Sequence, residues 1–337
     1  MPATVLAERV GWTGSITWFR QNVSRLRPEY RPADPVDHLL HNPGEQVQCD
    51  LWFPAVDIPV AGGSARFPVL VMVACHSRFV TAMMLPSRRT PDLLAGMWEL
   101  LSGQLGSVPR SLLWDNEAGI GRGGRLAEGV SGFCGVLATR LIQAPPRDPE
   151  TKGIVERANR YLETSFLPGR AFTGPEDFND QLAQWLEKRA NRRVVRAIKA
   201  RQVEAVEQGR AAMGVLPPVP PATAQRFTIR LSRSYYIRAA SCDSSVDPTM
   251  IDRLVQVEVT LNQVNIRHQG QLVGAHRRQW ARGPVVTDSA HVEIAASLRK
   301  AFKSGRSAPS DQNWDRDLSY YDQACGIDPA AIEGQVA

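Results

Sequence analysis

Alternating and periodic apolar residues divide the middle of the chain into predicted strands and helices. The stretch QVQCDLWFP from Gln46 alternates in the manner of a strand, and FPVLVMVACHSRFVTAMMLP predicts two strands around a polar turn. Two further strands, RSLLWDNE and TRLIQAPP, alternate with helices expected over 91–105, over about 126–137 and from near Thr151. Three strands followed by helix, strand, helix, strand and helix describe a mixed α/β domain over residues 46–210.

The segments before this domain carry weaker patterns. Residues 1–30 place apolar positions at helical spacing on both sides of Gly11, which predicts two short helices around a turn. Such a pair is typical of a helix-turn-helix whose second helix enters a major groove, although a small hairpin with no DNA role fits equally well. The proline-containing residues 31–45 predict a linker.

The second half of the chain changes character twice. Residues 176–210 look helical and basic, as an extension of the α/β domain, and residues 211–225 contain a proline-rich linker, LPPVPPATAQ. Short alternating strands with turn signals over 226–285 predict a small β-barrel. Residues 286–337 are expected to hold one helix, near 290–302, and a polar tail.

The composition is that of a folded protein with two or three domains. Of the 337 residues, 43% are hydrophobic and 22% are charged, and no apolar run approaches the ~20 residues that span a bilayer. The five cysteines are scattered without a CxxC pair, which argues against a disulfide framework and a structural zinc site. We therefore expect a cytoplasmic protein with no membrane partner. The formal charge of +6 mildly favours a polyanionic partner.

Three acidic residues occur where a fold could bring them together. Asp50 lies inside an apolar strand, where an unpaired charge would be costly and calls for a cation or a metal ion. Asp115 closes another strand at its carboxyl end, the edge where open sheets place their ligands. Glu156 lies at the margin of the apolar stripe of a helix, with Lys152 and Arg160 four residues away on either side. Taken singly, each acid fits a turn or a surface ion pair better than an active site.

Carboxylates suit a particular chemistry. Mg²⁺ prefers hard oxygen ligands and keeps positions open for phosphate oxygens and water. Two such ions, about 3.5–4 Å apart, can activate an attacking oxygen and stabilise a leaving one during phosphoryl transfer. Three carboxylates from separate elements are enough to hold that pair of ions.

The sequence around these acids resembles the retroviral-integrase-like core of DDE transposases, and most closely the IstA-type transposase of two-gene insertion sequences. The matching stretches are QCDLWFP, HSRFVTAMMLP, LLWDNEAG and APPRDPETKGIVERANRYLE, and the interval from Asp115 to Glu156 is close to the usual one in this superfamily. Further matches are ANRRVVRAI, SVDPTMIDRLVQVEVTLNQVNIRHQGQLVGAH and the front piece ERVGWTGSITWFRQNVSRLRP. Together they run in family order from residue 3 to about residue 300.

The resemblance implies an RNase H-like fold and a catalytic triad of Asp50, Asp115 and Glu156 that holds two divalent ions, Mg²⁺ or Mn²⁺. Residues beside the acids become candidates for contacts with DNA: Asn116, Lys152, Arg157 and Arg160. The resemblance also implies transposon-end and target double-stranded DNA as substrates, an AAA+ ATPase as a helper, a homo-oligomer on DNA and a place in the nucleoid.

Two basic segments are further candidates for contacts with DNA. Residues 188–201 hold seven basic residues and no acid. On a helix, four arginines would share one face and could follow a phosphate backbone, with a merely solvated face as the alternative: Arg189, Arg192, Arg193 and Arg196. In the predicted barrel, arginines interleave with two tyrosines, for which core packing is the simpler interpretation: Arg226, Arg230, Arg233, Arg238, Tyr235 and Tyr236.

The sequence thus predicts a transposase that cuts transposon ends with water and then joins the freed 3′-hydroxyl to target DNA. Two rivals are a non-catalytic DNA-binding regulator derived from a transposase and an RNase H-type nuclease, although a simple hybrid nuclease needs neither the basic segment nor the barrel. An upstream helix-turn-helix expected for the group is missing here. We therefore expect a shortened form, by nature or by a late start codon, in which recognition of specific transposon ends is in doubt.

Overall fold

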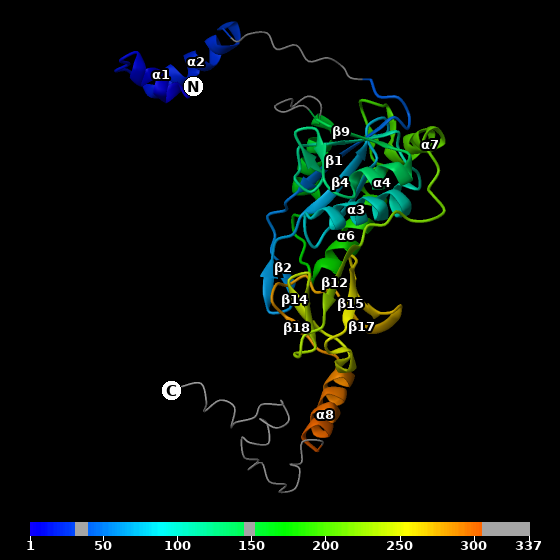
Figure 1. Cartoon of the computed structure of the whole chain (residues 1–337). Helices are drawn as coiled ribbons and strands as arrows, with labels where there is room; N and C mark the ends of the chain where they lie inside the picture. The colour runs from blue at the N-terminus through cyan, green and yellow to red at the C-terminus, as the bar shows by residue number, and fades with distance from the viewer. Residues whose placement is uncertain (31–39, 145–151, 305–337) are drawn as a thin grey trace, which may run out of the picture.

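The computed structural model describes residues 1–30, 40–144 and 152–304. A helix pair comes first, followed by an α/β unit, by a β unit and by a helix that extends away from the β unit (Figure 1). The predicted 31–45 linker and 286–337 tail lie partly outside the described residues. Within the described ranges, no helix is long and apolar enough to cross a membrane.

The α/β unit is built on one five-stranded sheet in the order β5-β4-β1-β6-β9. The five strands are β1 (Gln46–Trp52), β4 (Val69–Ala74), β5 (Val80–Met84), β6 (Ser111–Trp114) and β9 (Arg140–Gln143). The first three pair antiparallel, whereas β6 and β9 join β1 in parallel. All five follow the predicted strands. This order and these directions are those of an RNase H-like core, so the predicted mixed α/β fold is confirmed.

Helices cover both faces of the sheet. One face packs against α3 (Thr90–Glu99), its π-helical continuation Leu100–Leu105, and α4 (Val130–Leu137). The other face packs against α5 (Gly153–Tyr161), which continues as a π-helix over Leu162–Phe166, and against α6 (Pro175–Lys188).

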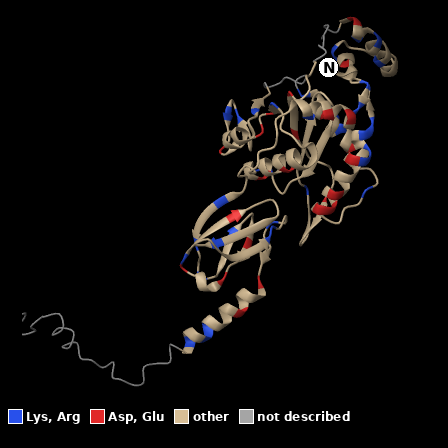
Figure 2. Ribbon diagram, turned by 90° about the vertical axis from the view of Figure 1, so that its right-hand side faces the viewer, with Lys and Arg blue, Asp and Glu red and all other residues tan. Residues whose placement is uncertain are grey.

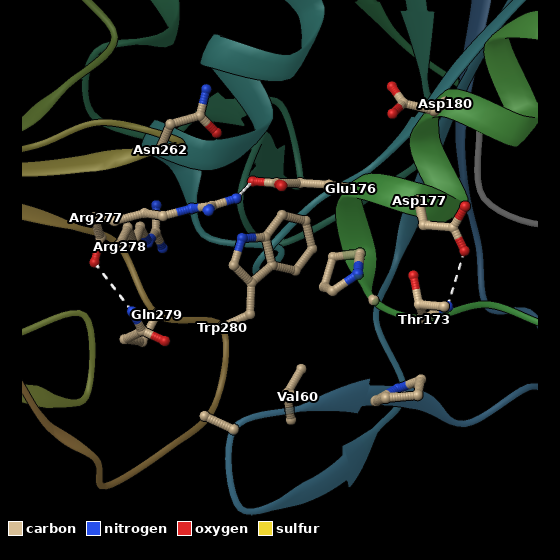
Figure 3. Close-up of a pocket in the computed structure, with 14 residues that line it drawn as sticks. Val60, Thr173, Glu176, Asp177, Asp180, Asn262, Arg277, Arg278, Gln279 and Trp280 are labelled. Atoms are coloured by element: carbon tan, nitrogen blue, oxygen red, sulfur yellow. Dashed lines mark hydrogen bonds and ion pairs between the residues drawn. The ribbon is translucent and has the colours of Figure 1, made fainter.

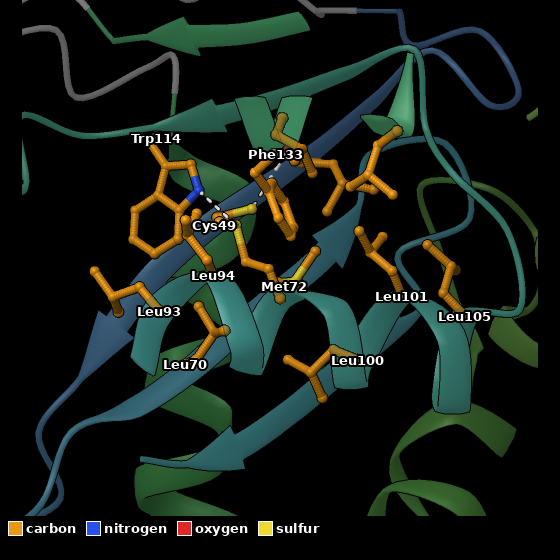
Figure 4. Packing of buried hydrophobic residues seen from close by; sticks show 14 of the residues in the cluster. Cys49, Leu70, Met72, Leu93, Leu94, Leu100, Leu101, Leu105, Trp114 and Phe133 are labelled. Carbon is orange, nitrogen blue, oxygen red and sulfur yellow. Dashed lines mark hydrogen bonds between the residues drawn. The ribbon is translucent and has the colours of Figure 1, made fainter. Parts of the chain in front are cut away.

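Side chains alternate across each strand, so neighbouring residues of β1 serve different cores. Cys49 lies in the first of them, together with Met72, Trp114 and Phe133 (Figure 4). The next residue, Asp50, therefore faces the helix layer of α5. This alternation positions the candidate site.

The structure also contains elements that the sequence analysis did not predict. A two-stranded hairpin of β2 (Ile58–Val60) and β3 (Gly63–Ala65) follows β1, and a second pairs β7 (Gly121–Arg122) with β8 (Arg125–Leu126). These strands are only two or three residues long, too short for an alternating pattern to stand out.

The first thirty residues form the two predicted helices, α1 (Ala3–Arg9) and α2 (Ile16–Tyr30).

The segment 176–210, predicted to be helical, is helical at both ends but not over 189–201. Helix α6 ends at Lys188, and a 3₁₀ turn, Ala190–Arg192, leads into a hairpin of β10 (Val194–Val195) and β11 (Ala200–Arg201) before α7 (Gln202–Ala212). The cause is tertiary. The Asn191 side chain accepts a hydrogen bond from the Val80 N–H and donates one to the Val80 carbonyl, both at 2.9 Å. These two hydrogen bonds fix Asn191 to the edge of the sheet. A continued helix would have led the chain away from that edge.

The β unit has two sheets and no closed barrel among the described residues. A four-stranded antiparallel sheet runs in the order β12-β15-β16-β17, and a three-stranded sheet in the order β13-β14-β18. Their bounds are β12 (Gln225–Arg230), β13 (Tyr236–Ala239), β14 (Cys242–Ser245), β15 (Leu254–Val259), β16 (Gln263–His268), β17 (Gln271–Arg277) and β18 (Val285–Val286).

The predicted barrel is corrected because one edge of β14 pairs with β18 in parallel instead of with an edge strand of the larger sheet. A 3₁₀ turn, Pro248–Met250, and α8 (Ser289–Ser304) complete the unit. The predicted helix near 290–302 is confirmed.

A buried ion pair joins the two units. The Arg278 guanidinium donates to both carboxylate oxygens of Asp92, at 2.6 and 2.9 Å, and both side chains are more than nine-tenths buried. Beside it, the Trp280 ring meets Phe67 edge-on at 5.1 Å. Figure 3 shows Trp280 between Val60 of β2 and the start of α6, in a pocket of about 600 Å³.

Candidate active site at the ends of the central strands

Asp50 is held by two side chains from the helix layer. The Lys152 ammonium lies 2.8 Å from its Oδ1, and the Asn159 amide donates to its Oδ2 at 2.8 Å. The Lys152 side chain is only 8% exposed and that of Asp50 25% exposed. Both carboxylate oxygens are therefore satisfied, which answers the expectation that a charge in this strand needs a strong partner. Nearby, burial raises the pKa of the Cys49 thiol well above its usual value, so Cys49 acts as a neutral core residue.

Asp115 follows the end of β6, the strand that pairs in parallel with β1. Strands β1 and β6 run parallel, and their last paired residues are Gln48 and Leu113. Asp50 and Asp115 each follow two residues later, so this register, if extended by two residues, would put them at the same level of strands about 4.8 Å apart. The Asp115 side chain is exposed, and its Oδ1 accepts the N–H of Asn116 at 2.7 Å.

Glu156 lies on the same helix face as the two partners of Asp50. It follows Lys152 by four residues and precedes Asn159 by three, the spacings that stack side chains along one helix face. The helix itself is fastened to β1, because the Gln48 side chain accepts the N–H of Val155 at 3.0 Å. Glu156 remains exposed to solvent.

The three acids offer the donor chemistry of a magnesium site, but their present arrangement does not form a complete one. In residues 1–30, 40–144 and 152–304, no three histidine, cysteine or acidic side chains are gathered closely enough to hold an ion. Both carboxylate oxygens of Asp50 are already bound, one to Lys152 and one to Asn159. Asp50 and Asp115 thus belong to two strands that pair in parallel, and Glu156 lies on α5, the helix fastened to β1.

The candidate DNA contacts around the acids have different environments. Arg157 and Arg160 are exposed on α5, and the Arg157 Nε donates to the Gly153 carbonyl at 2.6 Å. Asn116 is half-buried, and its side chain bridges the Ala144 carbonyl and the Gly123 N–H at 3.5 and 3.4 Å. Asn116 thus fastens the strand end to its surroundings.

The predicted ridge of four arginines on one helix face does not exist. Arg189 and Arg192 flank and end the 3₁₀ turn, Arg193 lies with its guanidinium 3.8 Å from the centre of the Tyr161 ring, and Arg196 is in the turn of the β10–β11 hairpin. All four are exposed. Figure 2 shows lysines and arginines spread over both units and α8.

Two of the four arginines predicted for the barrel form ion pairs. Arg226 binds Glu258 and Arg238 lies 3.5 Å from Asp243. The rings of the adjacent Tyr235 and Tyr236 lie 4.9 Å apart and are half-buried, which agrees better with packing than with a DNA contact.

Sequence reasoning missed two residues of the site, Gln48 and Asn159. Both could have been found from spacing. Gln48 precedes Asp50 by two residues and so shares its face of the strand, and Asn159 lies seven residues, or two helical turns, after Lys152.

Comparisons with known proteins agree with the resemblance. The family described as Mu transposase, C-terminal domain, matches residues 216–288. A Sinorhizobium fredii protein described as a transposase is 26% identical over 83% of this chain and 55% of its own. The transposase of insertion sequence IS21 from Pseudomonas aeruginosa is 27% identical over 80% of this chain and 70% of its own. The chain spans about half the length of several of these relatives.

Two solved structures of integrases are similar at low identity. One is a simian T-cell lymphotropic virus intasome in complex with a PP2A regulatory subunit, with 16% identity, 83% of this chain and 97% of that chain covered, and a TM-score of 0.42. The other is the catalytic core domain of BIV integrase, with 16% identity, 50% and 98% covered, and a TM-score of 0.38. The fold assignment rests on strand order and direction instead. The predicted resemblance of this chain to insertion-sequence transposases, IS21 included, is confirmed by the relatives.

Proposed function

We propose that this protein is a DDE-type transposase that cuts transposon ends and joins them to target DNA, with Asp50, Asp115 and Glu156 as its catalytic carboxylates. The observation that carries the proposal is the register of β1 and β6. Extended by two residues, this register supports a placement of Asp50 and Asp115 near one another at the carboxyl ends of parallel strands, and the helix that carries Glu156 packs against β1. Open α/β sheets place their active sites at this edge.

The three carboxylates would hold Mg²⁺ or Mn²⁺, which when bound polarise the phosphate and stabilise charge on the attacking and leaving oxygens. The chain's own residues set the geometry. Gln48 fastens α5 to β1, so that Glu156 stays opposite Asp50 and Asp115. Lys152 and Asn159 hold the Asp50 carboxylate in a fixed orientation. They are positioning residues.

The reaction has two displacements at phosphorus. Water first attacks the phosphodiester at the transposon end: a new P–O bond forms, the bond to the 3′-oxygen breaks, and that oxygen leaves as a 3′-hydroxyl. The freed 3′-hydroxyl then loses its proton and attacks a phosphodiester of target DNA, releasing a target 3′-hydroxyl. The number of phosphodiester bonds is unchanged in the second step, so no energy source is needed for the chemistry.

Conservative substitutions test this assignment. Asp50→Asn and Glu156→Gln proteins should bind a DNA duplex as tightly as the unaltered protein, yet lose end cleavage and strand transfer on a plasmid that carries the element ends. Glu187→Gln is a matched control, because Glu187 is an exposed acid on α6, outside the site. Full activity of either Asp50→Asn or Glu156→Gln would overturn the triad.

A DNA-binding regulator without catalysis is the second candidate, because the described acids do not gather into a complete ion site. It predicts binding of duplex DNA with no nicking at any Mg²⁺ or Mn²⁺ concentration. Nicking that requires a divalent ion and disappears in Asp50→Asn would exclude the regulator.

Partners follow from the resemblance and are part of the proposal. We expect two DNA ends to be held by a homo-oligomer, which light scattering with and without end DNA would detect as a change in mass. A helper ATPase of the AAA+ class should increase strand transfer without changing end cleavage, since target choice concerns only the second step.

A further inference from the structure

A groove between the α/β unit and the β unit has the positive charge expected of a site that binds a polyanion. We define this interdomain groove by four segments: the β2–β3 hairpin with residues 64–68, residues 86–89 before α3, the turn 240–241, and residues 278–282 after β17. Its volume is about 560 Å³. It contains five arginines and no acidic residue: Arg66, Arg88, Arg89, Arg278 and Arg282.

Three of these arginines have no carboxylate partner among the described residues. Arg66 pairs with Asp57 and Arg278 with Asp92, whereas Arg88, Arg89 and Arg282 are exposed and form no ion pair there. The neighbouring pocket around Trp280 differs, because Glu176, Asp177 and Asp180 line it beside its arginines. The unbalanced positive charge is therefore particular to the interdomain groove.

The buried Arg278 gives a second, independent sign of a ligand. Its two terminal nitrogens bind Asp92, and Nη1 also donates to the Thr260 carbonyl, but its Nε has no hydrogen-bond partner although it is buried. Buried donors are rarely left unpaired. Arg278 lines the groove, so its unpaired N–H is a candidate donor to an acceptor oxygen bound there.

The groove lies next to the candidate catalytic acids. Phe53, exposed at one end of the groove, follows Asp50 by three residues. On the other side, the backbone of Arg88 lies against Gly119, where an added Cβ would come within 2.4 Å of the Arg88 carbonyl. Gly119 belongs to the loop that follows Asp115. Arg88 therefore lies against the loop that follows Asp115, and the same groove also contains Arg89 and Arg282.

We propose that the interdomain groove binds one sugar-phosphate strand of double-stranded DNA beside the reacting phosphate. Arg88, Arg89 and Arg282 contact successive phosphates, and the Arg278–Asp92 pair holds the two walls at a fixed separation. Contacts to phosphates add affinity and register without reading the base sequence. The inference rests on the proposed function only in taking DNA as the partner.

The salt dependence of binding tests this assignment. Each lost phosphate contact makes the slope of log K against log salt concentration shallower by about 0.9, so Arg88→Ala with Arg89→Ala and Arg282→Ala should reduce it by about 2 to 3. Binding of a random-sequence duplex is measured by fluorescence anisotropy without divalent ions, with the full chain. The matched control removes the same charge from exposed residues outside the groove: Arg253→Ala, Arg299→Ala and Lys300→Ala.

The expected result is a shallower slope for the groove variant and an unchanged slope for the control variant. Equal slopes for the two variants, or no change in the groove variant, would overturn the proposal. Arginine modification by phenylglyoxal provides a measurement on the unaltered protein: DNA should protect Arg88, Arg89 and Arg282 more than Arg253. Because no catalysis is involved, failure here leaves the triad untouched, and an inactive Asp50→Asn protein that still binds leaves the groove untouched.

Discussion

The ion pair between Lys152 and Asp50 should contribute measurably to the stability of the α/β unit. Lys152→Met keeps much of the aliphatic side chain and removes the ammonium that lies 2.8 Å from the Asp50 Oδ1. Asp50 would keep only the Asn159 amide as a partner. A carboxylate that is three-quarters buried would then lack its nearest positive charge.

The expected cost lies between two limits. Removing one partner of a fully buried pair costs about 3–5 kcal/mol, whereas exposed pairs contribute about 0–1 kcal/mol. At 2.8 Å and an effective dielectric constant of about 20, the gross attraction is about 6 kcal/mol, most of which offsets the desolvation of the two charges. Since Asp50 is 25% exposed and keeps one hydrogen bond, we expect Lys152→Met to lower the free energy of unfolding by about 1.5–3 kcal/mol.

A double-mutant cycle measures the pair itself. Urea unfolding of the unaltered protein, Lys152→Met, Asp50→Asn and the double variant should give a coupling free energy of about 1–2 kcal/mol. Mg²⁺ should stabilise Lys152→Met more than the unaltered protein, because Lys152 no longer competes for Asp50. Additivity of the two substitutions within about 0.5 kcal/mol would refute the reasoning, since it would mean that the contact carries no net energy.

Three further predictions concern the β unit, its attachment and the edge strand of the α/β sheet. Burial lowers the pKa of His291 from 6.5, and its Nδ1 meets the Ser245 hydroxyl at 2.9 Å, so the neutral ring is favoured by folding. The contribution of His291 to stability should be complete above about pH 6.5 and should be lost as the pH falls through the lower folded-state pKa. Between pH 7 and pH 5, the urea midpoint should therefore fall more in the unaltered protein than in His291→Phe. Equal changes in the two proteins would contradict this. Arg278→Met leaves Asp92 buried without its cation and should weaken the association of the two units by about 3–5 kcal/mol. The measurement is proteolysis of the 211–225 segment, which should be faster in the variant. Equal cleavage rates would show that the pair is unnecessary. Asn191→Ala removes two hydrogen bonds to the edge strand and should lower stability by about 1–3 kcal/mol by thermal unfolding, whereas a neutral effect would mean that water replaces them.

Much of the candidate site could be predicted from local sequence, and the reason is physical. A strand that is buried on both faces reads as an apolar run, so the charge at Asp50 stands out. The turn after a strand reads as a polar tip, which places Asp115 at the carboxyl end. Helical spacing likewise put Lys152 next to Glu156. None of these inferences depends on which strand pairs with which.

Strand pairing and side-chain contacts between distant segments were decided by the tertiary structure alone. The sequence places 64 residues between Asp50 and Asp115, and only the parallel pairing of β1 with β6 brings their strands together. Likewise, nothing in the local pattern of 188–201 indicates that Asn191 binds the edge strand at Val80, and this contact ends the helix that periodicity predicted.

The sequence by itself therefore determined the type and order of the main elements, the three acids and their places at element ends, since these follow from alternation, helical spacing and the cost of buried charge. Tertiary structure decided the partners: Lys152 and Asn159 on Asp50, Arg278 on Asp92, and two sheets where a barrel was expected. These contacts depend on which overall packing has the lowest free energy. That free energy includes interactions between residues that are far apart in the chain, so local sequence patterns do not reveal it.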